Sequence, residues 1–264
     1  MSRIVAFALN TFREAMRNKL LYTILLFACA LILSTWAIGQ LSVHEEARVT
    51  RDLGLGGISF FGVVLSIVAG VNLVYQEIER KTVYVLLSKP VRRWEFVLGK
   101  YAGVALTLAV QMGLMSAVMF GALLAQNVFP DAQLLRAVLL LYVEVLVVTA
   151  VATLFSTFST PLLSGLYAFG ITMCGRFLPD LRTIISARLK DVPDLAAALN
   201  GVTHVLPDLH LFFVSGGQVD GVAMSVNATY VGWSYVAWTS GYGLGYAACV
   251  LLLATVIFSR RDFV

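Results

Sequence analysis

Long apolar runs separated by short polar segments dominate this sequence. Six runs approach or exceed the roughly 20 residues that a membrane-crossing helix needs. In approximate bounds they are Leu20–Leu41, Ile58–Tyr75, Tyr101–Gln126, Leu134–Phe158, Pro161–Leu178 and Tyr235–Phe258. Backbone polar groups in lipid must be satisfied within the segment, so runs of this length predict helices, whereas barrel strands would be shorter and would alternate. We therefore predict an all-α integral membrane protein with six transmembrane helices in a single domain, 1–264.

The N-terminal residues 1–19 follow a different pattern. Apolar side chains recur at helical spacing from Ile4 to Met16, while arginines and asparagines occupy much of the remaining surface. This pattern is typical of an amphipathic helix that lies in the membrane interface. We expect it to connect directly to the first span.

The charges between the runs predict the orientation. With the N-terminus in the cytoplasm, the cytoplasmic segments hold twelve of the 19 lysines and arginines, and the other side holds seven. Lysine and arginine are enriched in cytoplasmic loops. An even number of spans then returns the C-terminus to the cytoplasm, as expected for a multi-pass protein of a bacterial inner (plasma) membrane. The long segment 179–232 would face outside, with a short surface helix near Leu181–Lys190.

Composition agrees with a membrane protein and excludes several other classes. Apolar residues make up 59% of the chain and charged residues 13%, against about 45–50% and 25% in soluble domains. The net charge of +4 is scattered between apolar runs, so no nucleic-acid partner is expected. Cys29, Cys174 and Cys249 lie inside apolar runs, and His44, His204 and His210 match no standard ligand spacing, so we predict no metal site.

The segment 76–100, between the second and third runs, carries the strongest functional signal. It holds nine of the chain's 34 charged residues, mixed with apolar positions on both sides of Pro90. Two short amphipathic pieces around a proline would form a compact projection on the cytoplasmic face. A basic loop that anchors on lipid is the alternative, but the mixture of acidic, basic and apolar residues favours docking to a protein.

This segment resembles the coupling segment of ABC-2 type transporter permeases. That family carries E-x-E-[KR]-x-T, then L-L-[SA]-x-P-[IV]-x-R, then F-x-x-G-K. The matching residues here are Glu77, Glu79, Arg80 and Thr82, then Leu86, Leu87, Ser88, Pro90, Val91 and Arg93, then Phe96, Gly99 and Lys100. Lys81 stands where many members have glycine. The ending from Phe258 to Phe263 also resembles the family's short basic C-terminus.

The resemblance implies an ABC transporter permease, an exporter, that pairs with a second permease copy or a paralogue. A separate ABC ATPase would bind ATP and magnesium and dock under the coupling segment. The residues that would couple to it are Glu77, Glu79, Arg80, Thr82, Leu86, Pro90, Arg93, Phe96 and Lys100. The chain itself has no G-x-x-x-x-G-K-[ST] phosphate loop, so we expect no enzyme activity and no cofactor in this subunit.

Several polar residues lie within the predicted spans. Glu144 is ten residues into the fourth run, where a charge costs roughly 2.5–3.5 kcal/mol on insertion scales. It is either part of a substrate path or a structural bond between spans, with Arg136 and Arg176 as candidate partners. Asn72 and Gln111 are candidates for polar contacts between helices. Gly241, Gly243 and Gly245 predict a small-residue face that includes a G-x-x-x-G and is suited to close helix packing, within the chain or across a dimer.

Two other functions stay open at this point. An intramembrane enzyme would need convergent catalytic groups, but apart from Glu144 the spans offer no histidine, aspartate or lysine. A scaffold or receptor subunit without transport would need no ATPase partner. Hydrophobic or amphiphilic cargo is the substrate class that the apolar spans favour.

Overall fold

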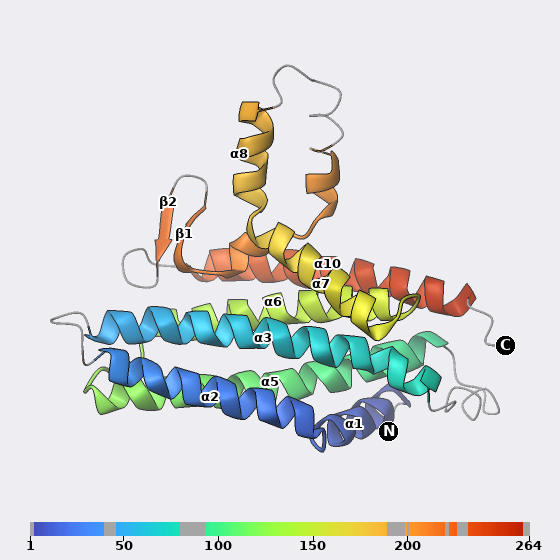
Figure 1. Cartoon of the computed structure of the whole chain (residues 1–264), viewed down its shortest axis with the longest axis horizontal. Coiled ribbons are helices and arrows are strands. Elements are labelled where there is room, and N and C mark those ends of the chain that lie inside the picture. The colour runs from blue at the N-terminus through green and yellow to red at the C-terminus, as the bar shows by residue number, and fades with distance from the viewer. Residues whose placement is uncertain are drawn as a thin grey trace.

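The computed structural model describes residues 3–39, 46–79, 93–188, 199, 201–219, 222–225 and 232–260. Its long helices lie side by side along the long axis of the molecule, and α8 stands away from them (Figure 1). The helices are α1 (Arg3–Ala15), α2 (Lys19–Gly39), α3 (Glu46–Glu79), α5 (Arg93–Ala125), α6 (Ala132–Ser156), α7 (Pro161–Arg176), α8 (Leu178–Arg188) and α10 (Trp233–Arg260). A 3-10 turn, η1 (Leu209–Phe212), precedes the antiparallel strands β1 (Ser215–Val219) and β2 (Val222–Ser225).

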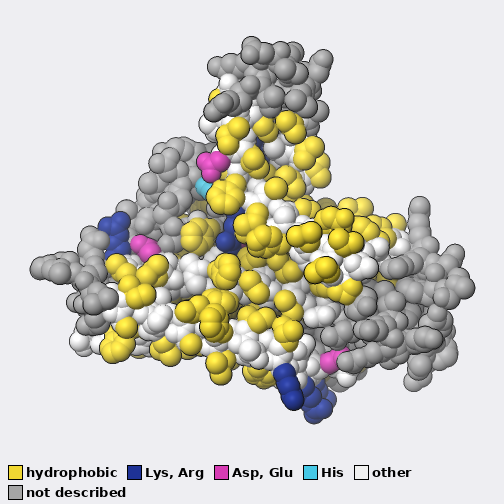
Figure 2. All heavy atoms as spheres, viewed as in Figure 1, with side chains coloured by type: hydrophobic (Ala, Val, Ile, Leu, Met, Phe, Trp, Pro, Cys, Tyr) yellow, Lys and Arg dark blue, Asp and Glu magenta, His cyan; other side chains and the backbone are white. Residues whose placement is uncertain are grey.

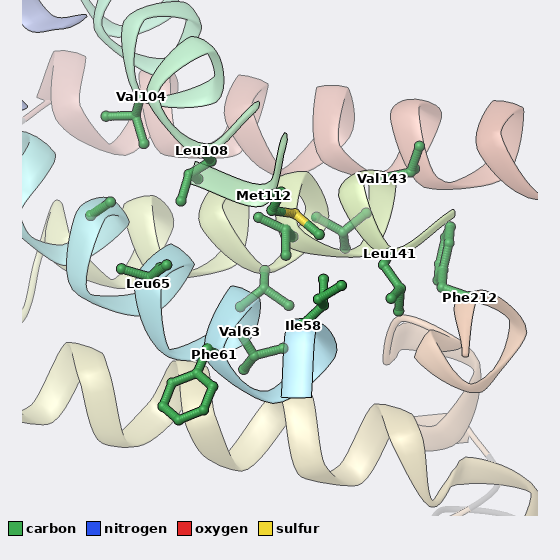
Figure 3. Packing of buried hydrophobic residues seen from close by; sticks show 14 of the residues in the cluster. Ile58, Phe61, Val63, Leu65, Val104, Leu108, Met112, Leu141, Val143 and Phe212 are labelled. Atoms are coloured by element: carbon green, nitrogen blue, oxygen red, sulfur yellow. The ribbon is translucent and has the colours of Figure 1, made fainter. Parts of the chain in front are cut away.

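Helices α3 and α6 form the centre of the bundle. α3 packs most extensively against α6, and it also contacts α2, α5 and α7. The two backbones approach closely at Gly70, where a Cβ would lie 2.9 Å from the Thr149 carbonyl oxygen and 2.8 Å from the Ala152 Cβ. Small residues at helix interfaces permit such approaches in membranes. Elsewhere in the bundle, apolar side chains such as Ile58, Leu108 and Met112 pack against each other in the interior (Figure 3).

Polar side chains add bonds between the packed helices. The Tyr101 hydroxyl on α5 donates to the Leu146 carbonyl at 2.8 Å, and the Tyr142 hydroxyl on α6 donates to the Ala105 carbonyl at 3.0 Å. Between lipid-facing helices the hydrophobic effect supplies little attraction, so packing and hydrogen bonds hold them together. This reciprocal pair therefore fixes how α5 sits against α6.

Five helices in the described residues are long and apolar enough to cross a membrane. They are Lys19–Gly39, Ala47–Leu73, Trp94–Ala125, Ala132–Ser156 and Trp233–Phe258. They match five of the six predicted spans. The remaining predicted span, Pro161–Leu178, is α7, which has 16 residues, below the usual range of about 17–25. The helical architecture is confirmed, and the count of six spans stays a prediction.

The second predicted span began too late. It was placed at Ile58, whereas α3 begins at Glu46, because the charges in its first two turns interrupt the apolar run. The structure pairs two of these charges: Arg48 lies 3.9 Å from Asp52, and Arg51 lies 3.0 Å from Asp131 at the start of α6. The β1–β2 hairpin in the segment 179–232 was likewise not predicted.

Helix α1 packs along the first turns of α5. The contact is close because α5 carries glycine at positions 99 and 103, four residues apart on one face. A Cβ on Gly103 would lie 2.5 Å from the Ala8 carbonyl oxygen, and one on Gly99 would lie 2.7 Å from the Phe7 Cβ. The predicted N-terminal helix is therefore present and docked on the protein. Its place in the membrane interface stays a prediction.

Candidate functional site

A buried ion pair links three helices. The Arg176 Nε at the end of α7 donates to the Glu144 Oε1 on α6 at 2.8 Å, and a terminal nitrogen of the same guanidinium lies 2.8 Å from that oxygen. The guanidinium also donates to the Ser59 hydroxyl on α3. Glu144 is completely buried, and the Arg176 side chain is 22% exposed. Of the two candidate partners for Glu144, the structure selects Arg176.

The end of α7 is held from several sides. The Arg176 guanidinium lies 5.8 Å from the centre of the Phe213 ring. One residue earlier, a Cβ on Gly175 would lie only 2.5 Å from the Pro207 carbonyl oxygen. Beyond the turn into α8, Arg182 contacts Asp208 at 3.4 Å. The ion pair thus lies where the helix bundle meets the segment that projects from it (Figure 1).

The other candidate partner, Arg136, makes a different contact. It is eight residues before Glu144 on α6, about 12 Å along the helix axis, which is too far for direct pairing. Its guanidinium lies 4.7 Å from the centre of the Trp233 ring, at the first residue of α10. This cation–π contact joins the N-terminal ends of α6 and α10.

The two described ends of the predicted coupling segment lie at the opposite end of the bundle from the contact between Arg136 and Trp233 (Figure 1). Glu77 and Glu79 belong to the last turn of α3, and Arg93 is the first residue of α5. The predicted coupling residues Arg80, Thr82, Leu86 and Pro90 lie outside the described residues. Only the two ends of the segment are described, and they show that it joins α3 to α5, two of the longest described helices.

Two predicted coupling residues point into the protein. Phe96 and Lys100 are each 6% exposed. The Phe96 ring lies between Phe7 of α1 and Phe258 of α10, with ring centres 5.7 and 6.2 Å apart. The Lys100 Nζ lies 5.3 Å from the centre of the Phe96 ring. These contacts join α1, α5 and α10 beside the coupling segment.

Asn72 and Gln111, the other polar residues predicted within the spans, have different surroundings. Asn72 lines a small cavity with Lys100, near the end of α3. Gln111 is buried on α5, and its Oε1 has no hydrogen-bond partner among the described residues. Among the described residues no hydrogen bond joins Asn72 or Gln111 to the Glu144–Arg176 ion pair, and neither Glu144 nor Gln111 lines the cavity beside Asn72.

The glycines of α10 face in two directions. A Cβ on Gly243 would lie 2.6 Å from the Val143 side chain and 2.8 Å from the Phe212 ring, so this glycine faces the protein. A Cβ on Gly241 or Gly245 would meet nothing within 4 Å. The prediction that all three glycines share one face is therefore wrong for Gly243, whereas Gly241 and Gly245, four residues apart, share an open side, and packing of this G-x-x-x-G against another helix stays a prediction.

A comparison with protein families adds an independent finding. The family model described as "ABC-2 family transporter protein" matches residues 5–263, nearly the whole chain. No curated protein matches this sequence.

Proposed function

This chain belongs to the ABC-2 family of transporter proteins, and from that premise we propose that it is the permease subunit of an ATP-driven exporter. A separate ATPase would supply the energy by docking on the coupling segment, 76–100. The observation that carries the proposal is the family match over residues 5–263, together with five helices that have the length and composition of membrane spans.

The helices next to the coupling segment suit the transmission of movement. α3, which enters the segment, has 34 residues and is about 50 Å long at 1.5 Å per residue. α5, which leaves it, has 33 residues. A displacement at residues 80–92 would therefore reach the far side of the bundle through two continuous helices. Rigid-body and hinge motions of this kind are common in switching proteins.

Contacts at the same end would carry the movement to other helices. α1 is packed against α5 at Gly99 and Gly103, and Phe96 contacts both Phe7 and Phe258. A shift of the first turns of α5 would thus move α1 and the end of α10 together. We infer that Phe96 and Lys100 transmit movement of the coupling segment to α1 and α10 through these internal contacts. The residues that face the ATPase would then come from the segment before Arg93.

The buried fractions of the helices agree with a transport path between two copies of the permease. In the most apolar stretch of α6, 72% of residues are buried, against 28% in α2 and 33% in α10. Apolar side chains cover much of one face of the bundle (Figure 2). α2 and α10 therefore have surface available for lipid or a second permease, and we propose that cargo of hydrophobic or amphiphilic character passes between two copies.

The buried ion pair has a structural role in this proposal. Glu144 lies inside one chain and binds Arg176, so it is not exposed to a path between copies. We propose that it holds α3, α6 and α7 in one arrangement.

Recovery of an ATPase with the permease tests the proposal. The full-length protein would be purified from native membranes in mild detergent, and bound subunits identified by mass spectrometry. We expect a stoichiometric nucleotide-binding subunit. Leu86→Glu, in the coupling segment, should abolish its recovery because an apolar docking residue becomes charged.

Leu199→Glu is the matched control. Leu199 is 37% exposed and belongs to the segment 179–232, on the other side of the membrane in the predicted orientation. This variant should retain the ATPase. Absence of any nucleotide-binding subunit from the wild-type preparation would contradict the proposed function, and equal loss in both variants would contradict the assignment of the docking segment.

A further inference from the structure

Three basic side chains are exposed where α1 meets α2. Arg13 lies in the last turn of α1, Arg17 lies in the turn that follows, and Lys19 is the first residue of α2. Lysine and arginine side chains gather at this turn, at the lower edge of the molecule (Figure 2). These three residues are called the basic cluster below.

Backbone hydrogen bonds hold the cluster together. The Arg17 N–H donates to the Glu14 carbonyl and the Asn18 N–H donates to the Ala15 carbonyl, each at 3.0 Å. The Asn18 Oδ1 accepts from the Leu20 N–H at 3.0 Å and so caps the start of α2. An ordered turn therefore brings the three cations together.

The charges of the basic cluster are available to a ligand. Among the described residues, no hydrogen bond or ion pair occupies the side chains of Arg13, Arg17 or Lys19. Glu14, the acidic residue next to Arg13, already interacts elsewhere in the protein. The first turn of α2 contains no acidic residue. The cluster thus carries an excess of positive charge, which favours an anionic partner.

The basic cluster adjoins surface that lipid can cover. Lys19 begins the apolar span Lys19–Gly39. Directly after it, Leu20 is 52% exposed and Tyr22 is 44% exposed. A lipid whose acyl chain contacts Leu20 would have its phosphate near Lys19. Long basic side chains at the end of a span keep their charges at the level of the headgroups.

We propose that the basic cluster binds the headgroups of anionic phospholipids, in the leaflet on the side of the coupling segment. Phosphate oxygens would accept hydrogen bonds from Arg13 and Arg17, since a guanidinium can donate to phosphate in pairs, and Lys19 would add a third charge. Exposed apolar surface beside the cations favours a lipid over an acidic protein. Bound lipids would hold α1, which packs against α5 at Gly99 and Gly103, on the membrane surface.

The proposal does not depend on ATPase docking and can be tested on the permease alone. The full-length protein in mild detergent would be titrated with dioleoyl phosphatidylglycerol and with dioleoyl phosphatidylcholine, and binding followed by native mass spectrometry. Phosphatidylglycerol should bind more tightly, because it carries a net negative charge and phosphatidylcholine does not. The difference should shrink at high salt, because the Debye length falls from about 10 Å at 0.1 M to about 3 Å at 1 M. Glycerophosphoglycerol, which lacks acyl chains, distinguishes a lipid from a soluble phosphate.

Substitutions at the cluster measure the contribution of each charge. Arg17→Gln should weaken phosphatidylglycerol binding about fivefold, the contribution of one basic residue near an anionic membrane surface. The triple variant Arg13→Gln, Arg17→Gln, Lys19→Gln should weaken it about a hundredfold. Arg17→Lys keeps the charge and should retain most of the binding. Arg48→Gln is the matched control, because it removes one exposed positive charge near the start of α3, at the other end of the bundle (Figure 1).

Each outcome decides for or against the site. Loss in Arg17→Gln with retention in Arg17→Lys and Arg48→Gln supports it. Equal binding of the two lipids to the wild type, or equal losses in Arg17→Gln and Arg48→Gln, would overturn it. Binding of glycerophosphoglycerol as tight as that of the diacyl lipid would overturn a membrane source. Loss of a co-purified ATPase from the triple variant, with phosphatidylglycerol binding unchanged, would assign the cluster to a protein partner instead.

Discussion

Replacement of Arg176 by leucine should destabilise the protein more than replacement of Glu144. Glu144 is completely buried, and Arg176 contacts it at 2.8 Å. Removing one partner of a buried pair typically costs about 3–5 kcal/mol, because the other charge stays buried. Arg176→Leu leaves the carboxylate in this position. We therefore expect Arg176→Leu to lower the free energy of unfolding by about 4 kcal/mol.

Glu144→Leu leaves the arginine, whose side chain is 22% exposed. A long cationic side chain can move its charged end toward water while its stem stays packed. The free energy of unfolding should then fall by about 1–3 kcal/mol, which is the usual cost of burying an unsatisfied polar group. The double variant should lose less than the sum of the two single losses, since replacing a whole buried pair by apolar residues is often neutral.

Unfolding in mixed micelles measures these differences. The protein would be titrated with a denaturing detergent while the fluorescence of its four tryptophans is followed. Arg48→Leu is the control, because Arg48 pairs with Asp52 at 3.9 Å on the exposed side of α3, and exposed pairs contribute about 0–1 kcal/mol. If Arg176→Leu costs no more than Arg48→Leu, or if the two single losses add exactly, the reasoning about the buried pair is wrong.

Three further predictions concern packing and hydrogen bonds. Gly103→Leu should detach α1 from α5, because a Cβ there would lie 2.5 Å from the Ala8 carbonyl oxygen; faster proteolysis within α1 would reveal it, and unchanged proteolysis would contradict it. Gly243→Leu should lower the unfolding free energy by about 1–3 kcal/mol through overpacking, whereas Gly241→Leu should not, since its Cβ position is open; similar unfolding curves for the two would refute the assignment of faces. Tyr142→Phe should cost about 1 kcal/mol by removing its 3.0 Å bond to the Ala105 carbonyl, measured in the same titration; no loss would show that the bond contributes nothing.

The spans were predicted well where local composition decides them. A helix in lipid needs only a sufficient apolar run, and the run Leu134–Phe158 matches α6, Ala132–Ser156, within two residues at each end. The prediction was poorer where charges have distant partners. The start of α3 was missed because Arg51 pairs with Asp131, a residue 80 positions away that the local pattern does not reveal.

The candidate site was predicted in part. A carboxyl in the middle of an apolar run requires a partner, and this requirement can be read without a structure. Arg136 could have been excluded by its spacing, because eight residues along one helix span about 12 Å, but the contact between Glu144 and Arg176 depends on how α7 crosses α6. The contribution of Ser59 was not predicted, because a serine on a helix has no distinctive pattern. The pair of glycines at 99 and 103 is a signal that could have revealed the docking of α1.

The sequence by itself determined that this protein is a helical membrane protein of the ABC-2 type, because apolar length and local motifs act within short stretches of chain. The tertiary structure alone decided which residues meet. It placed Lys100 beside a cavity between α1, α2, α3 and α5, and it placed Glu144 against Arg176. From the sequence, Lys100 was known only as a residue of the coupling motif, and Glu144 only as a carboxyl within an apolar run. The physical reason is that a helix's own pattern predicts which side is apolar, but only packing selects the neighbour that each side meets.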